Sequence, residues 1–169
     1  MTKEYLGRVK LGSVASMTPI QRWAYLERHH ELALATVDGD GVIYNSPPWY
    51  TIKDRRIFIP IDQASKHMKN MENGSALSAT VFSGGEELAT AQGVIIQGRG
   101  EMVEDPELAQ ECVDRLVDHV FGVGHPHKNA YKEYREYFDN ATIELKPEKL
   151  ITWDMRKVYN FQMYSARRL

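Results

Sequence analysis

A short polar segment, QASKHMKNMENG at residues 63–74, holds the side chains that are best suited to binding an anion. It follows the apolar run RIFIPI and places Ser65 and Lys66 where a strand ends and a helix begins. Free N–H groups at a helix start favour phosphate, and serine and lysine side chains add charge-assisted hydrogen bonds. Lys69 lies near Lys66 at helical spacing. Taken alone, the segment fits a solvated helix better than a binding site. The preceding strand and the Ser-Lys order favour a binding site, so the segment in its context predicts a phosphate site.

The composition is that of a folded single domain without a broad charged surface. The chain has 169 residues, of which 43% are hydrophobic and 26% charged, and its net charge is −2. This balance is ordinary for a globular protein and does not indicate a nucleic-acid partner. The single cysteine, Cys112, excludes an intramolecular disulfide. No segment has the pattern of a signal peptide or a membrane span, so we expect a cytoplasmic protein without a membrane partner.

The first half of the chain predicts one helix and several short strands. Thr18 is a good N-cap and Pro19 suits the first helical position, so we expect a helix to begin there. Pro47 and Pro48 cannot donate to a sheet, so their strand must lie at an edge or contain a bulge. The strands are expected at residues 32–37, 42–52, 57–61 and 75–83, with the turn DGDG after the first.

The second half predicts longer strands and two helices. We expect a strand region at residues 89–104 with bulges or bends at Gly93, Gly98 and Gly100. We expect a helix at residues 106–122, a loop at 123–129 and a second helix at 130–138. A strand, a turn and a strand are expected over residues 141–155.

Many short strands joined by hairpins indicate a mainly β protein with peripheral helices. Glycines within long strands fit a closed antiparallel barrel, because closure requires strands to tilt and bend locally. We therefore expect one barrel domain at residues 18–155, with an N-terminal arm at 1–17 and a C-terminal tail at 156–169.

Three segments, taken in order, resemble the pyridoxamine-phosphate-oxidase-like split barrels. They are LALATVDGDGVIYNSPPWYTIKDRRIFIPIDQASKHMKNMENGSALSATV at 32–81, VIIQGRGEMVEDPE at 94–107 and KPEKLITWDM at 146–155. The resemblance covers roughly residues 20–155. It implies a six-stranded antiparallel Greek-key split β-barrel that forms a homodimer and holds a flavin at the subunit interface.

The resemblance also implies which residues hold the cofactor, FMN. Ser65 and Lys66 would contact its phosphate, and Lys69 matches the second basic position of the family. The other matching positions border the isoalloxazine ring or the ribityl chain: Pro48, Trp49, Tyr50 and Gln92 for the ring, and Ile59 and Pro60 for the chain.

Two residues depart from the family pattern. Pro60 stands where many members carry a hydroxyl, and His67 stands where the phosphate-binding oxidases carry a second permanent cation. The C-terminal segment RKVYNFQMYSARRL lacks the family's vitamin B6 pattern. The specific activity of the named oxidase is therefore not predicted.

The resemblance implies a flavin-dependent oxidoreductase that transfers two electrons or a hydride with a small-molecule substrate. The flavin would supply the chemistry, so no catalytic side chain is assigned. Two alternatives stay open: the deazaflavin coenzyme F-420 in place of FMN, and a non-enzymatic protein that binds flavin or haem. His67, His125 and His127 would be the candidate haem ligands; GHPH alone offers too few ligands for zinc.

Overall fold

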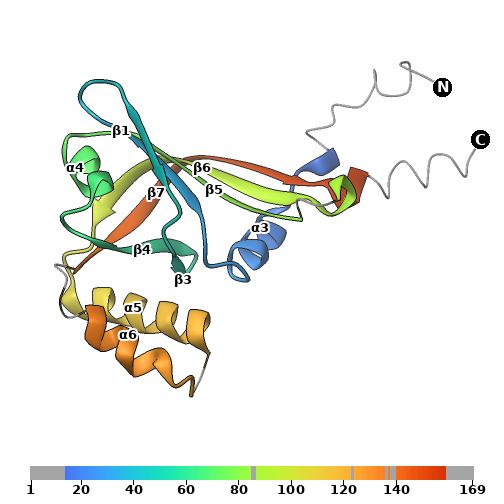
Figure 1. The fold of residues 1–169 in the computed structure, drawn as a ribbon. Helices are drawn as coiled ribbons and strands as arrows, with labels where there is room; N and C mark the ends of the chain where they lie inside the picture. Colours follow the sequence, from blue (N-terminus) through green and yellow to red (C-terminus); the bar gives the residue numbers. More distant parts are fainter. Residues whose placement is uncertain (1–13, 85–86, 123, 136, 138–139, 159–169) are drawn as a thin grey trace, which may run out of the picture.

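The computed structural model contains a seven-stranded antiparallel sheet with helices packed around it (Figure 1). It describes residues 14–84, 87–122, 124–135, 137 and 140–158. The strands are β1 (Ala33–Val37), β2 (Ile43–Ser46), β3 (Thr51–Lys53), β4 (Arg56–Asp62), β5 (Leu77–Ser83), β6 (Gln92–Met102) and β7 (Asn140–Asp154). The helices are α3 (Pro19–Leu26), α4 (Lys66–Glu72), α5 (Pro106–Phe121) and α6 (His127–Arg135), with a 3-10 turn at Leu88–Thr90. The strand order is β2-β1-β5-β6-β7-β4-β3.

The expected fold class, mainly β with peripheral helices, is confirmed. The number of six strands that the resemblance implied was wrong, because the sheet has seven. Pro47 and Pro48 divide the predicted strand at 42–52 into β2 and β3. The predicted arm and tail lie largely outside the described residues, which leave out 1–13 and 159–169. No helix in the described part of the chain is long and apolar enough to cross a membrane.

The two end strands of the sheet, β2 and β3, are neighbours in the chain. Beyond the end of β2, the chain still pairs with the segment before β1, through an isolated bridge between Glu31 and Trp49. The Leu32 N–H donates to the Pro48 carbonyl at 3.2 Å, and the Tyr50 N–H donates to the His30 carbonyl at 2.8 Å. The segment before β1 therefore contacts the segment that leads into β3, so the sheet curves back on itself.

Helix α3 begins where its cap predicts. Thr18 accepts a hydrogen bond from the Gln21 N–H, and the Gln21 side chain accepts one from the Thr18 N–H. This reciprocal capping box satisfies two of the N–H groups that a helix start leaves unpaired. Pro19 occupies the first turn, where a missing N–H costs nothing.

The longest pairing in the sheet joins β6 and β7 and contains a bulge. Gln97 pairs with Lys149 whereas Gly98 pairs with Pro147, so Glu148 is the extra residue. We expected a strand, a turn and a strand over residues 141–155, and the turn was wrong, because the bulge lets Pro147 remain inside one continuous strand. A bulge or bend was expected at Gly98, and the bulge lies opposite it, in β7.

The hydrophobic core lies between the curved sheet, α3 and α4. Its members come from every strand except β2, with Tyr25 and Leu26 from α3 and Met68 from α4. Helix α5 packs outside β3 and β4, and α6 packs against α5 on the side away from the sheet (Figure 1). The Arg115 guanidinium of α5 donates to the Ile52 carbonyl of β3 at 3.0 Å, which holds α5 against that strand.

Gly98→Ala should lower the free energy of unfolding by about 1–3 kcal/mol, the usual cost of overpacking. A Cβ atom at residue 98 would meet the Lys146 carbonyl oxygen, which belongs to the backbone and cannot move aside. Gly39→Ala is the control, because its Cβ would have no heavy atom within 4 Å. Urea unfolding of both variants checks this, and equal stabilities would contradict it.

Candidate phosphate site at the start of helix α4

The predicted anion-binding residues lie at the junction of β4 and α4. Ser65 is the N-cap residue of α4, and its hydroxyl oxygen accepts from the Met68 N–H at 3.2 Å. Its own hydroxyl hydrogen is not used in that bond. The Lys66 side chain is 45% exposed, and its ammonium lies 3.0 Å from the Asp38 carboxylate. Lys69 is exposed one turn further along the helix.

Asp38 belongs to the β1–β2 turn that the sequence predicts only as a turn. Its Oδ1 accepts from the N–H groups of Asp40 at 3.1 Å and Val42 at 2.9 Å. Its Oδ2 faces Lys66. The Lys66 ammonium and these backbone N–H groups lower the pKa of the Asp38 carboxyl below its ordinary value. Asp38 is therefore a fixed negative charge beside the predicted phosphate contact.

His67 is buried, with 2% of its surface exposed, and it joins α4 to two strands. Its Nδ1 lies 3.0 Å from the Thr36 hydroxyl of β1, and its Nε2 lies 2.8 Å from the Ser46 hydroxyl of β2. The Asn70 amide donates to the same Thr36 hydroxyl at 2.9 Å. The arrangement that satisfies every atom has Thr36 donating to Nδ1 and Nε2–H donating to Ser46.

Burial lowers the pKa of His67, so the imidazole is neutral at neutral pH. His67 therefore does not supply the second cation that the family carries at this position. Sequence reasoning missed its role, although one signal was present. His67 and Asn70 share one helical face, and Lys66 and Lys69, one residue earlier in each case, share another.

The residues predicted to border the flavin ring point in different directions. Trp49 packs beside Phe121 and Tyr131 of the α5–α6 pair, with ring centroids 6.5 and 6.0 Å away. Tyr50 is 1% exposed, and its hydroxyl donates to the Leu26 carbonyl at 2.7 Å. Burial raises the pKa of Tyr50 above its ordinary value. Pro48 is half-buried between the two strands.

Ile59 and Pro60, predicted beside the ribityl chain, are both buried in β4. Ile59 is 1% exposed and belongs to the hydrophobic core. Both residues pair with β7, opposite Ile143 and Thr142. Their place near the α4 junction is set by β4, which ends three residues before Ser65.

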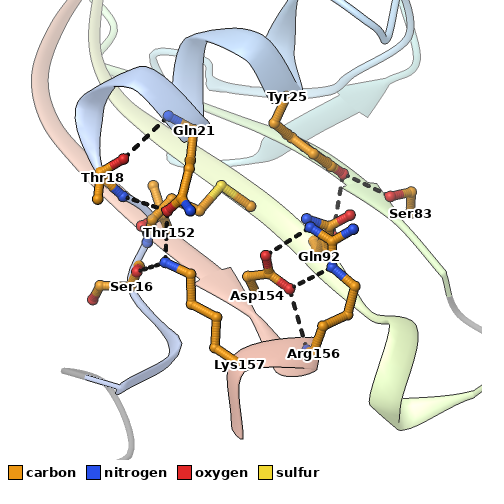
Figure 2. Close-up of polar contacts among 11 residues, drawn as sticks. Ser16, Thr18, Gln21, Tyr25, Ser83, Gln92, Thr152, Asp154, Arg156 and Lys157 are labelled. Carbon is orange, nitrogen blue, oxygen red and sulfur yellow. Dashed lines mark hydrogen bonds and ion pairs between the residues drawn. The ribbon is translucent and has the colours of Figure 1, made fainter. Parts of the chain in front are cut away.

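Gln92 lies at the opposite end of the sheet from α4. In Figure 2 it sits among Tyr25, Ser83, Asp154 and Arg156. The Tyr25 hydroxyl donates to the backbone carbonyl of Gln92 at 3.2 Å. Helix α4 reaches β6 near Gly100, where a Cβ would meet Met71. Eight residues of strand span about 26 Å. Within one chain, the structure therefore does not bring Gln92 to Ser65 and Lys66.

Two cavities lie elsewhere on the molecule. One of about 540 Å³ lies between the end of α3, β3 and α5, and its lining includes His29, Tyr50, Arg115 and His119. Another of about 570 Å³ lies at the end of β6 beside α5. Ser65 and Lys66 line neither cavity. In the described part of the chain, no three His, Cys, Asp or Glu side chains converge to hold a metal ion.

The match to a known family agrees with this fold. The family described as pyridoxamine 5'-phosphate oxidase matches residues 21–154, which is most of the chain. This protein belongs to the pyridoxamine 5'-phosphate oxidase family. No curated protein matches the chain significantly.

Solved structures show the same fold at low identity. The conserved hypothetical protein Rv2991 from Mycobacterium tuberculosis has a TM-score of 0.77 and 19% identity, covering 89% of this chain and 92% of that chain. HutZ, a heme storage protein from Vibrio cholerae, has a TM-score of 0.62 and 21% identity, covering 82% and 96%. An F-420 reductase has a TM-score of 0.55 and 21% identity, covering 75% and 93%. A split-barrel fold is consistent with these structures.

His67 should make the folded protein less stable as the pH falls. Because burial lowers its folded pKa, the unfolded chain takes up the proton first, near the ordinary pKa of about 6.5. The free energy of unfolding should therefore fall below about pH 6.5, by up to about 1.4 kcal/mol per pH unit for this group. His67→Gln should show a smaller fall in urea unfolding between about pH 7.5 and 5.

His127→Gln, at an exposed position, is the control and should keep the wild-type pH dependence. His119, whose pKa burial also lowers, remains in both variants and accounts for part of the remaining fall. An identical pH dependence in His67→Gln and wild type would contradict the assigned role of His67.

Proposed function

We propose that this chain is a flavin-nucleotide-dependent oxidoreductase that binds the phosphate of its cofactor at Ser65 and Lys66. The observation that carries the proposal is the placement of these two residues. They lie at the β4–α4 junction, at the positions that match the family motif, with the Lys66 ammonium partly exposed and the Ser65 hydroxyl hydrogen available to donate.

The residues present are compatible with a phosphate. A lysine ammonium and a hydroxyl each donate to phosphate oxygens, and hydrogen bonds to a charged group are stronger than neutral ones. The His67 network holds α4 so that Lys66 and Lys69 both face solvent. FMN would supply two-electron or hydride chemistry with a small-molecule substrate, and the chain would supply binding and orientation.

We also propose that the protein is a homodimer of split barrels, with the cofactor at the subunit interface. The β1–β2 hairpin beside Lys66 exposes four apolar side chains. They are Val37 (42% exposed), Val42 (60%), Ile43 (69%) and Tyr44 (40%). Val37 and Ile43 lie directly opposite each other in the hairpin and so share one face. An exposed apolar face next to a binding site is typical of an interaction surface. A second copy seated here would cover it and help to enclose the cofactor.

The deazaflavin coenzyme F-420 is the alternative that this site also accommodates, because it too carries a phosphate. Haem is less well supported by the candidate ligands. Both ring nitrogens of His67 are already engaged by hydroxyls. His125 is exposed on the connection before α6, where its Nδ1 accepts from the His127 N–H at 3.2 Å. An absorbance spectrum of the purified protein separates flavin, deazaflavin and haem.

Lys66→Ala should weaken FMN binding by about tenfold to a hundredfold, because one charge-assisted contact to phosphate is lost. Binding of riboflavin, which has no phosphate, should not change. Lys69→Ala should show a smaller loss, since residue 69 lies one helical turn further on. Isothermal titration with both ligands measures this. Equal affinity of the wild type for FMN and riboflavin would remove the phosphate site.

Light scattering after size-exclusion chromatography should give about twice the chain mass of 19.4 kDa, as a twofold dimer requires. Ile43→Glu should favour the monomer, because it places a charge in the exposed apolar surface of β2. Ile20→Glu is the control, since Ile20 is also highly exposed but lies on α3. A monomeric wild type at micromolar concentration would contradict the dimer.

A further inference from the structure

We infer that the cavity between the end of α3, β3 and α5 binds a small zwitterion, a molecule that carries both a carboxylate and an ammonium group, such as a free amino acid. Arg115 would hold the carboxylate, and Glu27 and His29 would hold the ammonium. The cavity volume of about 540 Å³ suits such a ligand, since small-molecule pockets usually measure about 300–1,000 Å³. The inference does not depend on the proposed function, because Ser65 and Lys66 do not line this cavity.

The cavity has a buried floor and two polar walls. The floor is formed by three buried residues at and just before β3: Tyr50, Thr51 and Ile52. One wall is the end of α3, and the other is a face of α5 on which residues follow at helical spacing. The residues of the two walls are Glu27 and His29 at the end of α3, and Arg115, Asp118 and His119 on α5.

The α5 wall offers a hydrogen-bond donor with a fixed position. Arg115 donates to the Ile52 carbonyl at 3.0 Å, which holds its guanidinium at the floor of the cavity. In the described part of the chain no carboxylate pairs with Arg115, because the acids around it on α5 are paired with lysines. These pairs are Lys53–Glu111, Lys132–Asp114 and Lys128–Asp118. The remaining N–H groups of the guanidinium form a planar fork, which matches a carboxylate.

The α3 wall offers acceptors instead. His29 Nδ1 lies 2.7 Å from the Tyr25 carbonyl, which can only accept, so Nδ1 carries the hydrogen of this bond. In the neutral ring, Nε2 is then an acceptor.

The second acceptor of this wall is the exposed carboxylate of Glu27, the C-cap residue of α3. The C-terminal end of a helix carries a partial negative charge, and the last turn of α3 has no basic residue to offset it. Arg28, the next residue in the chain, does not line the cavity. This wall therefore attracts a cationic donor.

The two walls together select for a ligand with both charges. Glu27 and Arg115 line the same cavity, but they are not paired with each other among the ion pairs of the described residues. A simple carboxylate would satisfy Arg115 and be repelled by Glu27, and a simple amine would meet the opposite situation. A zwitterion satisfies both residues, so the arrangement discriminates against ligands that carry one charge only.

The test begins with the wild type and each of the standard L-amino acids, followed by ligand-observed NMR at millimolar concentration. The amino acid that binds best is then compared with two derivatives: its amide, which lacks the carboxylate, and its N-acetyl form, which lacks the ammonium. Dissociation constants are measured for wild type, Arg115→Gln, Glu27→Gln and Glu72→Gln. The last is the control, because Glu72 is an exposed acid at the end of α4 that does not line the cavity.

The wild type should bind the amino acid more tightly than either derivative. Arg115→Gln should weaken amino-acid binding by about tenfold to a hundredfold, because a charge-assisted contact is lost, and should leave binding of the amide unchanged. Glu27→Gln should weaken amino-acid binding by about twofold to fivefold, since an exposed ion pair contributes less, and should leave binding of the N-acetyl form unchanged. Glu72→Gln should behave as wild type.

Three results would overturn the inference. They are binding of none of the amino acids by the wild type, equal affinity for an amino acid and its N-acetyl form, and equal weakening of the amino acid and its amide in Arg115→Gln. If urea unfolding shows that Arg115→Gln destabilises the fold, Glu27→Gln decides, because its side chain is exposed. Unchanged amino-acid affinity in Glu27→Gln would then overturn the inference. None of these measurements uses FMN, so their failure leaves the proposed function standing.

Discussion

The orientation of α4 depends on one buried imidazole. His67 uses both of its ring nitrogens, one with a hydroxyl of β1 and one with a hydroxyl of β2. Rotating the helix would leave these polar atoms unpaired in the interior, which is costly. Lys66 and Lys69, each one residue before a buried member of this network, are consequently directed outward. A neutral hydrogen-bond network, rather than attraction between charges, therefore sets the position of the two lysines.

The β1–β2 hairpin links the proposed functions of this region. It supplies the hydroxyls that hold His67, the carboxylate that faces Lys66, and the exposed apolar side chains of β2. A change in the hairpin would therefore alter the helix, the charge at the phosphate site and the proposed subunit contact together. Such shared use means that effects of substitutions here will not add independently, since they act on one connected set of contacts.

Sequence reasoning succeeded where a few neighbouring residues determine the structure. Thr18 and Pro19 define the start of α3, and Gly98 lies opposite the bulge in β7. It failed where the outcome depends on a distant partner. Pro147 looks like a turn residue, yet the register opposite Gly98 keeps it in a strand. Asp38 and Lys66 are 28 residues apart, so no local pattern could pair a turn acid with a helix lysine. The direction of Trp49 likewise depends on α5 and α6, which come much later in the chain.

The break at Pro47 and Pro48 has a consequence for solubility. A sheet with long, regular edge strands offers rows of unpaired N–H and carbonyl groups on which other chains can add, which leads to aggregation. Here the two end strands, β2 and β3, have only four and three residues, and the prolines between them have no N–H to offer. The hairpin can thus expose the side chains of Val37 and Ile43, which lie directly opposite each other on one face, while its backbone edge gives little support to the growth of a fibril.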